Sequence, residues 1–147
     1  MLTTITATPL AGGRCEVVAG DVRVPMASLT GLPLDLRATL SRQMRAIAAV
    51  ELPARLRELA GLDGLAVSRV VIRDQRTRWG SCAHGGAISL NWRLVQMPDA
   101  VRDYVLWHEL MHIRVPSHSR KFWAQVMRVC PAHAQARAWL RREGRHL

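Results

Sequence analysis

Three histidines and one glutamate lie within the segment WHELMHIRVPSHS, which covers Trp107–Ser119. His108 and His112 are four residues apart, so on a helix their imidazoles share one face, about one turn from each other. This spacing suits two ligands of a tetrahedral zinc ion. Glu109 is rotated by about 100 degrees from His108, which places its carboxylate beside a metal rather than on it. A glutamate in this position of an H-E-x-x-H helix can accept a proton from a water that the metal activates.

His118 follows His112 by six residues and needs a break in the helix to reach the same metal. In an unbroken helix six residues rise about 9 Å, and the third side chain would point away from the first two histidines. Pro116 is incompatible with simple continuation of the helix. The sequence therefore predicts a helix, a short reversal of the chain, and a third ligand near the start of the next helix.

The number of ligands separates this candidate site from a structural zinc site. Structural sites usually have four protein ligands, often cysteines in close pairs, and the chain contains no C-x-x-C motif. With three imidazoles the fourth position of the metal is open to water, as in catalytic sites. Neutral imidazoles leave the charge of the ion intact, which lowers the pKa of such a water to about 7. An open metal site beside a carboxylate base fits a hydrolase.

Tyr104 stands four residues before His108 and shares the ligand face of the predicted helix. Its hydroxyl could donate a hydrogen bond to the oxyanion of a tetrahedral intermediate, which would make Tyr104 a catalytic residue beside Glu109. Alternatively, its ring packs beside the site. Two residues outside the helix are also candidates: Gly80 in RTRWGSC indicates a bulge or a close approach to the backbone, and Asn91 either contacts the site or satisfies backbone groups.

The first part of the chain predicts strands followed by helices. Residues 15–24 have the pattern of a β-hairpin. Asp35 is placed to cap a helix that continues to Glu51, because apolar residues recur there at helical spacing. Pro53 interrupts that spacing, so a separate short helix is predicted over residues 52–62.

The second part of the chain changes from strands to helices. Residues 66–95 are rich in β-branched side chains and predict two or three antiparallel strands with a turn at the His-Gly-Gly tripeptide. A helix is predicted from Pro98, and Pro116 ends it. Ser117 or Ser119 can cap a second helix, and Pro131 begins a third.

These elements predict a single α+β domain over residues 1–147, with a small antiparallel or mixed sheet packed on helices and the last helices after it. A chain of 147 residues has the usual length for one hydrophobic core. No segment approaches a membrane span, and the N-terminus lacks the features of a signal peptide, so a cytoplasmic protein without membrane contact is predicted. The three cysteines are odd in number and widely spaced, which favours free thiols.

The formal charge of +10 would favour nucleic acid or acidic substrates as partners. The arginines are nevertheless scattered along the chain without a basic block, and a solvated basic surface accounts for them equally well. The charge alone therefore does not distinguish a nucleic-acid-binding protein from a protein with a solvated basic surface.

Four motifs occur in order along the chain: RDQRTRWGSC (73–82), ISLNWRL (88–94), YVLWHELMH (104–112) and HSRKFW (118–123). Together they resemble the YgjP-like metallopeptidase family, which is related to SprT-like and other small gluzincin-type zinc peptidases. The resemblance covers roughly residues 35–143, while residues 1–30 match the family poorly and are expected to form variable N-terminal strands. It implies a compact zincin-like core with a sheet edge beside a zinc cleft. It also implies that His108, His112 and His118 bind Zn²⁺ and that Glu109 is the general base.

Other functions are compatible with the same residues. The histidine spacing is also that of metzincins, but these normally have a glycine at the position of Val115. The leading hypothesis is a zinc metallopeptidase acting on peptide or protein. One alternative is hydrolysis of a nucleotide phosphoanhydride, with arginines of the RTRWGSC region on the phosphates. Another is a nucleic-acid-associated zinc protein with weak or no catalysis, which binds through C-terminal arginines. The arginines concerned are Arg76, Arg78 and Arg93 for phosphates, and Arg137, Arg141 and Arg142 for nucleic acid.

Overall fold

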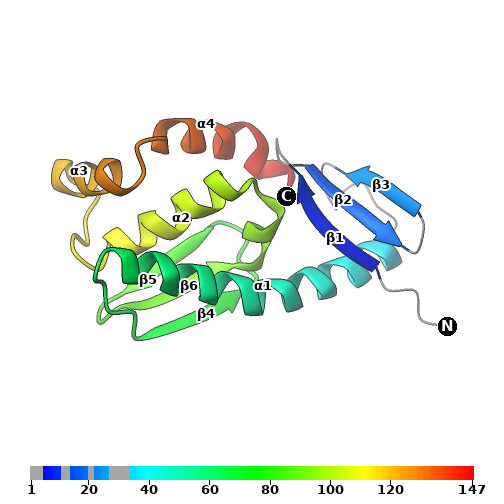
Figure 1. Ribbon diagram of the computed structural model, residues 1–147, viewed down its shortest axis with the longest axis horizontal. Coiled ribbons are helices and arrows are strands. Elements are labelled where there is room, and N and C mark those ends of the chain that lie inside the picture. Colours follow the sequence, from blue (N-terminus) through cyan, green and yellow to red (C-terminus); the bar gives the residue numbers. More distant parts are fainter. Residues whose placement is uncertain (1–4, 11–13, 20–21, 27–33) are drawn as a thin grey trace.

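The computed structural model describes the backbone of residues 5–10, 14–19, 22–26 and 34–147, and the side chains from residue 37 onward. Within these residues the chain forms an N-terminal sheet, a long helix, a second sheet and then further helices (Figure 1). The predicted α+β class is confirmed.

The N-terminal sheet is an antiparallel meander of β1 (Ile5–Leu10), β2 (Arg14–Ala19) and β3 (Val22–Met26). The pairing of β2 with β3 is the hairpin predicted over residues 15–24. Its turn at residues 20–21 lies outside the described residues. Strand β1 falls within residues 1–30, where N-terminal strands were expected without individual bounds.

Helix α1 (Leu34–Leu62) is one continuous helix, which corrects two predictions. It begins before Asp35, so this residue lies in the first turn rather than at the N-cap, and it passes through Pro53 without ending. A proline inside a helix costs about 3 kcal/mol, but apolar residues continue at four-residue spacing on both sides of it. Burying this single face offsets the loss of one backbone hydrogen bond. The buried residues of the face are Leu40, Met44, Ala48, Leu52, Leu56 and Ala60.

The second sheet contains β4 (Arg69–Arg73), β5 (Gly80–Ala83) and β6 (Ala87–Asn91) in the order β4-β6-β5. The pair β5–β6 is antiparallel, whereas β4 pairs with β6 in parallel. The sheet is therefore mixed, which is one of the two forms that the predicted fold allowed, and antiparallel pairing of all three strands is not observed. Side-chain alternation reports which face is buried and carries no information on strand direction. The predicted turn is present, and Gly85 and Gly86 adopt positive φ angles of 87° and 82° in it.

The remaining elements are η2 (Trp92–Gln96), α2 (Asp99–Met111), α3 (Arg120–Val129), α4 (His133–Glu143) and η3 (Gly144–His146). Helix α2 runs through the middle of the molecule, with α3 and α4 on one side and α1 and the second sheet on the other (Figure 1). Within the described residues no helix has the length and apolar character needed to cross a membrane.

Candidate metal centre

The three predicted histidine ligands meet at one point. The Nε2 atom of His118 lies 3.1 Å from Nε2 of His108 and 3.1 Å from Nε2 of His112. One ligand atom from each of the three lies within 4.8 Å of the other two. Zinc–nitrogen bonds of 2.0–2.1 Å in a tetrahedron place nitrogens about 3.3 Å apart. The spacing of these ring nitrogens therefore fits a shared metal ion.

The chain reverses between the second and third ligands, as predicted. Helix α2 ends at Met111, before Pro116, and His112 is its C-cap. The backbone N–H of Val115 still donates to the carbonyl of Met111 at 2.9 Å, which closes one more turn. Ser119, rather than Ser117, is the N-cap of α3. The third ligand thus stands directly before a new helix.

Backbone and side-chain contacts orient two of the rings. Nδ1 of His112 lies 3.0 Å from the carbonyl oxygen of Val115, so this nitrogen carries the proton that it donates and leaves Nε2 available as a ligand. Nδ1 of His108 lies 3.3 Å from the hydroxyl of Tyr104. Tyr104 is buried, and burial raises its pKa to about 12, so the phenol stays protonated. The observed contact is with a ring; the oxyanion role of Tyr104 stays a prediction.

Burial keeps two imidazoles neutral. It lowers the pKa of His108 to about 4, with repulsion from the neighbouring rings of His112 and His118 acting in the same direction. Burial also lowers the pKa of His112. At neutral pH both rings therefore have the uncharged form that binds metal ions.

Glu109 is 7% exposed and has no hydrogen-bond or ion-pair partner among the described residues. Its burial raises its pKa to about 7, and the charge of Arg78 opposes this rise only in part. Gly80, the first residue of β5, faces the Glu109 side chain so closely that no Cβ would fit between them. The close approach predicted at Gly80 is confirmed, and the group that approaches is the candidate base.

Phe122 touches all three histidine rings. Its fully buried ring stacks on His112, with centroids 4.4 Å apart and planes at 18°. Its edge-to-face contacts have centroid distances of 4.9 Å to His108 and 5.1 Å to His118. Its position four residues after His118, in the first turn of the next helix, is the sequence signal for these contacts.

Asn91 organises the loop between β4 and β5. Its Nδ2 donates to the carbonyls of Gln75 (2.7 Å) and Arg78 (3.0 Å), and its Oδ1 accepts from the backbone N–H of Arg93. Of the two roles predicted for Asn91, the structure therefore shows the one of satisfying backbone groups.

Two pockets adjoin the histidine cluster, one near each end of β5. The first has a volume of about 190 Å³ and includes His108 and Glu109 in its wall. The second has a volume of about 320 Å³ and includes His112 and Pro116. The other residues of the first are Arg78, Trp79, Gly80, Tyr104, Val105 and Leu140, and those of the second are Ala66, Cys82, Ala83, His84, Gly85, Gly86 and Ile113.

The family comparison gives the class of this protein as a metallopeptidase domain. Residues 21–143 match the model of the family described as "YgjP-like, metallopeptidase domain", so the chain belongs to the YgjP-like family. The resemblance found in the four sequence motifs is confirmed. The match begins before residue 35, where the motif-based resemblance was expected to start.

Among solved structures, the chain is similar to the metallopeptidase zymogen of Pyrococcus abyssi abylysin. The sequences are 25% identical, the TM-score is 0.51, and the likeness covers 59% of this chain and 86% of that chain. None of the curated proteins compared with the chain matches it.

Proposed function

We propose that the protein is a zinc-dependent peptidase in which His108, His112 and His118 hold the metal and Glu109 is the general base. The observation that carries this proposal is the convergence of three ring nitrogens beside a buried, unpaired carboxylate. Three protein ligands leave room for a water and a substrate carbonyl, as catalytic zinc sites require. The donor set consists of nitrogens alone, which suits zinc better than calcium or magnesium.

When bound, zinc supplies Lewis acidity that polarises a carbonyl and lowers the pKa of water. Glu109 takes the proton of the attacking water on its carboxylate and passes it to the leaving amine nitrogen. A carboxyl whose pKa is raised to about 7 can both accept and return a proton near neutral pH. Tyr104 either orients His108 through its Nδ1 or donates to the oxyanion, and the two roles predict different variant kinetics.

The outer edge of β5 is suited to an extended peptide. Strand β5 is at the edge of its sheet, and the backbone N–H of Asn91 donates to the carbonyl of Trp79 just before the strand begins. Hydrogen-bonded and non-hydrogen-bonded pairs alternate along an antiparallel ladder. The backbone groups of Gly80 and Cys82 therefore face away from β6. A substrate strand can pair with them by β-augmentation while the scissile bond lies against the histidine cluster.

Substitution of the candidate base tests the mechanism. We expect Glu109→Gln to keep the zinc content of the wild type and to lower peptide cleavage by about 10²- to 10⁴-fold, because general-base catalysis contributes that much. Glu58→Gln is the matched control, since Glu58 is exposed on α1 and its ion pair among the described residues is with Arg55. Zinc is measured by elemental analysis after gel filtration. A zinc-loaded Glu109→Gln protein with full activity would rule out the proposed role.

A second candidate function is hydrolysis of a nucleotide phosphoanhydride. It is favoured by a pocket beside the metal centre that contains Arg76, Arg78 and Arg93, because guanidinium groups bind phosphates bidentately. Nucleotide hydrolysis that is abolished by His108→Ala, together with no cleavage of any peptide, would favour this function over the first.

A further inference from the structure

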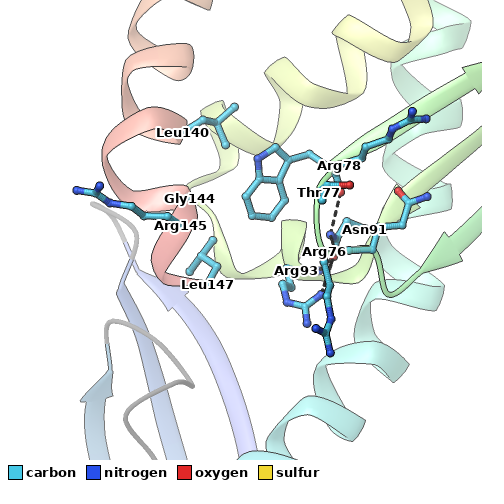
Figure 2. A pocket seen from close by; sticks show the side chains of 11 residues that line it. Arg76, Thr77, Arg78, Asn91, Arg93, Leu140, Gly144, Arg145 and Leu147 are labelled. Carbon is cyan, nitrogen blue, oxygen red and sulfur yellow. Dashed lines mark hydrogen bonds between the residues drawn. The ribbon is translucent and has the colours of Figure 1, made fainter.

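A third pocket, of about 350 Å³, is lined by arginines, and the described residues of its wall include no acidic side chain. One wall is the loop between β4 and β5, and the other is formed by the end of α4 and by η3 (Figure 2). Arg76 and Arg78 come from the first wall and leave the loop in opposite directions, while Arg145 comes from the second (Figure 2). Arg93 is the fourth arginine of this arginine pocket.

Three of the four guanidinium groups take no part in the ion pairs found among the residues whose side chains the structure describes. Arg93 is paired with Asp74 at 2.7 Å and also lies near Oδ1 of Asn91. Arg76, Arg78 and Arg145 have no ion-pair partner among the described residues. In Figure 2 these three side chains extend in different directions, so they give the pocket a positive potential rather than one convergent set of donors. Such a potential attracts an anion that is small enough to enter the pocket.

The arginine pocket adjoins the candidate active site. It shares Arg78, Trp79 and Leu140 with the smaller pocket that contains His108 and Glu109. Arg78 is close enough to Glu109 for its charge to act on that carboxyl. A substrate that fills the smaller pocket can therefore extend directly into the arginine pocket.

We propose that the arginine pocket binds a carboxylate of the peptide substrate, on the C-terminal side of the bond that is cleaved. This inference rests on the proposed peptidase function. A peptide that pairs antiparallel with β5 has its C-terminal part near Gly80, the end of the strand from which Trp79 and Arg78 lead into the pocket. Antiparallel pairs outnumber parallel ones two- to three-fold in sheets. The pocket thus makes an acidic side chain a determinant of specificity.

The shape of the site favours a carboxylate over a nucleic acid. The arginines line a single concavity, whereas single-stranded nucleic acids are bound in grooves that follow the backbone and present successive aromatic faces. Trp79 is the one aromatic residue of the arginine pocket. A guanidinium group can donate two parallel hydrogen bonds to one carboxylate. A peptide substrate carries such carboxylates itself, so no second ligand is needed.

Matched peptides test the proposal through a ratio of rates. Glu or Gln is placed at each of the three positions after, and each of the three positions before, a bond that the wild type cleaves. At one of the three positions after the cleaved bond, we expect kcat/KM to be about ten- to a hundredfold higher for the Glu peptide than for the Gln peptide, since hydrogen bonds between charged groups have that strength. The measured quantity is this ratio of the two kcat/KM values. The double variant Arg76→Gln/Arg145→Gln lowers this ratio to near one. Arg76→Glu, which reverses one charge, lowers it as well. Arg57→Gln, on the exposed face of α1, keeps the ratio of the wild type.

Binding separates this inference from the peptidase proposal. If no peptide is cleaved, the peptidase function fails, and fluorescence anisotropy of the same Glu and Gln peptides on Glu109→Gln protein still tests the pocket. Tighter binding of the Glu peptide, lost in the arginine variants, supports the carboxylate site. The proposal is overturned by equal binding and cleavage of the two peptides, by a preference for Glu only before the cleaved bond, or by competition from inorganic triphosphate at concentrations where acidic peptides do not compete.

Discussion

Gly80 lies against Glu109: a Cβ atom at position 80 would be 2.9 Å from Cγ and 3.2 Å from Oε1 of Glu109. It would also be 3.1 Å from the carbonyl oxygen of Ser89 in the neighbouring strand. Gly80 belongs to β5 and Glu109 belongs to α2. Because Gly80 has no side chain, the sheet edge can lie this close to the candidate base.

We therefore expect Gly80→Ala to lower catalysis while the metal stays bound. The new methyl group displaces the carboxylate, and a misplacement of about 1 Å can cost about 10²-fold in rate. The measurements are kcat/KM and zinc content. Gly61→Ala is the matched control, because nothing lies within 4 Å of its Cβ position. Wild-type activity in Gly80→Ala would show that the approach of strand and glutamate does not matter for catalysis.

Tyr104→Phe distinguishes the two roles predicted for the tyrosine. Loss of the partner of His108 Nδ1 should weaken zinc binding by about 10- to 100-fold, measured by competition with a chelator. If Tyr104 only orients His108, kcat at saturating zinc stays within a few-fold of the wild type. If its hydroxyl binds the oxyanion, kcat falls by about 10²- to 10³-fold even when zinc is saturating.

Phe122→Ala should affect stability and metal binding together. Removal of a fully buried phenylalanine costs about 3–5 kcal/mol in the free energy of unfolding, measured by urea denaturation of the metal-free protein. Because the ring touches all three histidines, zinc affinity should fall as well. Met127→Ala, on the same helix and 59% exposed, should change the free energy of unfolding by less than about 0.5 kcal/mol. Unchanged zinc affinity in Phe122→Ala would show that the ring does not position the ligands.

Asp63 connects three parts of the chain that surround the ligand loop. Its carboxylate accepts from Arg128 of α3 at 2.7 and 2.9 Å, and it also pairs with Arg114, which lies between the second and third ligands. The hydrogen bond from Arg128 lowers the pKa of Asp63. The carboxylate therefore stabilises the fold above its unfolded-state pKa of about 3.9, and this contribution is lost as the pH falls through the lower pKa of the folded state.

Asp63→Asn should lower the melting temperature at neutral pH by a few degrees and weaken zinc binding, with less additional loss of stability than the wild type on acidification below pH 4. Melting curves between pH 3 and pH 7 are the measurement. Asp99→Asn is the control, because Asp99 is 77% exposed and pairs within its own helix. Identical acid profiles of wild type and Asp63→Asn would contradict the assignment.

Burial of Glu109 should be visible in the metal-free protein. Its pKa rises from 4.5 to about 7 on folding, so the folded state binds the proton more tightly than the unfolded state does. Ionisation then reduces stability as the pH rises from 4.5 to about 7, by up to about 3 kcal/mol. The difference in unfolding free energy between Glu109→Gln and wild type should grow over this interval in favour of the variant. The histidines contribute equally to both proteins, so a constant difference would contradict the raised pKa.

The sequence predicted which residues of the candidate site come together better than it predicted the elements that support them. Residue types and spacing were sufficient for the histidine triad and the glutamate, because both depend on local helix geometry and on the break before Pro116. The parallel pairing of β4 with β6 was not predictable, since it depends on which strands meet across the sheet. The continuity of α1 through Pro53 depends on an apolar face that extends at four-residue spacing on both sides of the proline, and burial of this face offsets the cost of the proline. Contacts over long sequence separation, such as Asp63 with Arg128, leave no local pattern.

The three candidate ligands differ in their access to solvent. His108 and His112 are half-buried on or next to α2, whereas His118 is exposed on the segment that turns into α3. A metal ion can therefore lose its third ligand without any movement of α2, and the two remaining imidazoles would retain it only weakly. We expect the rate of metal exchange to depend on the mobility of the segment between Pro116 and Ser119, and far less on the opening of the hydrophobic core.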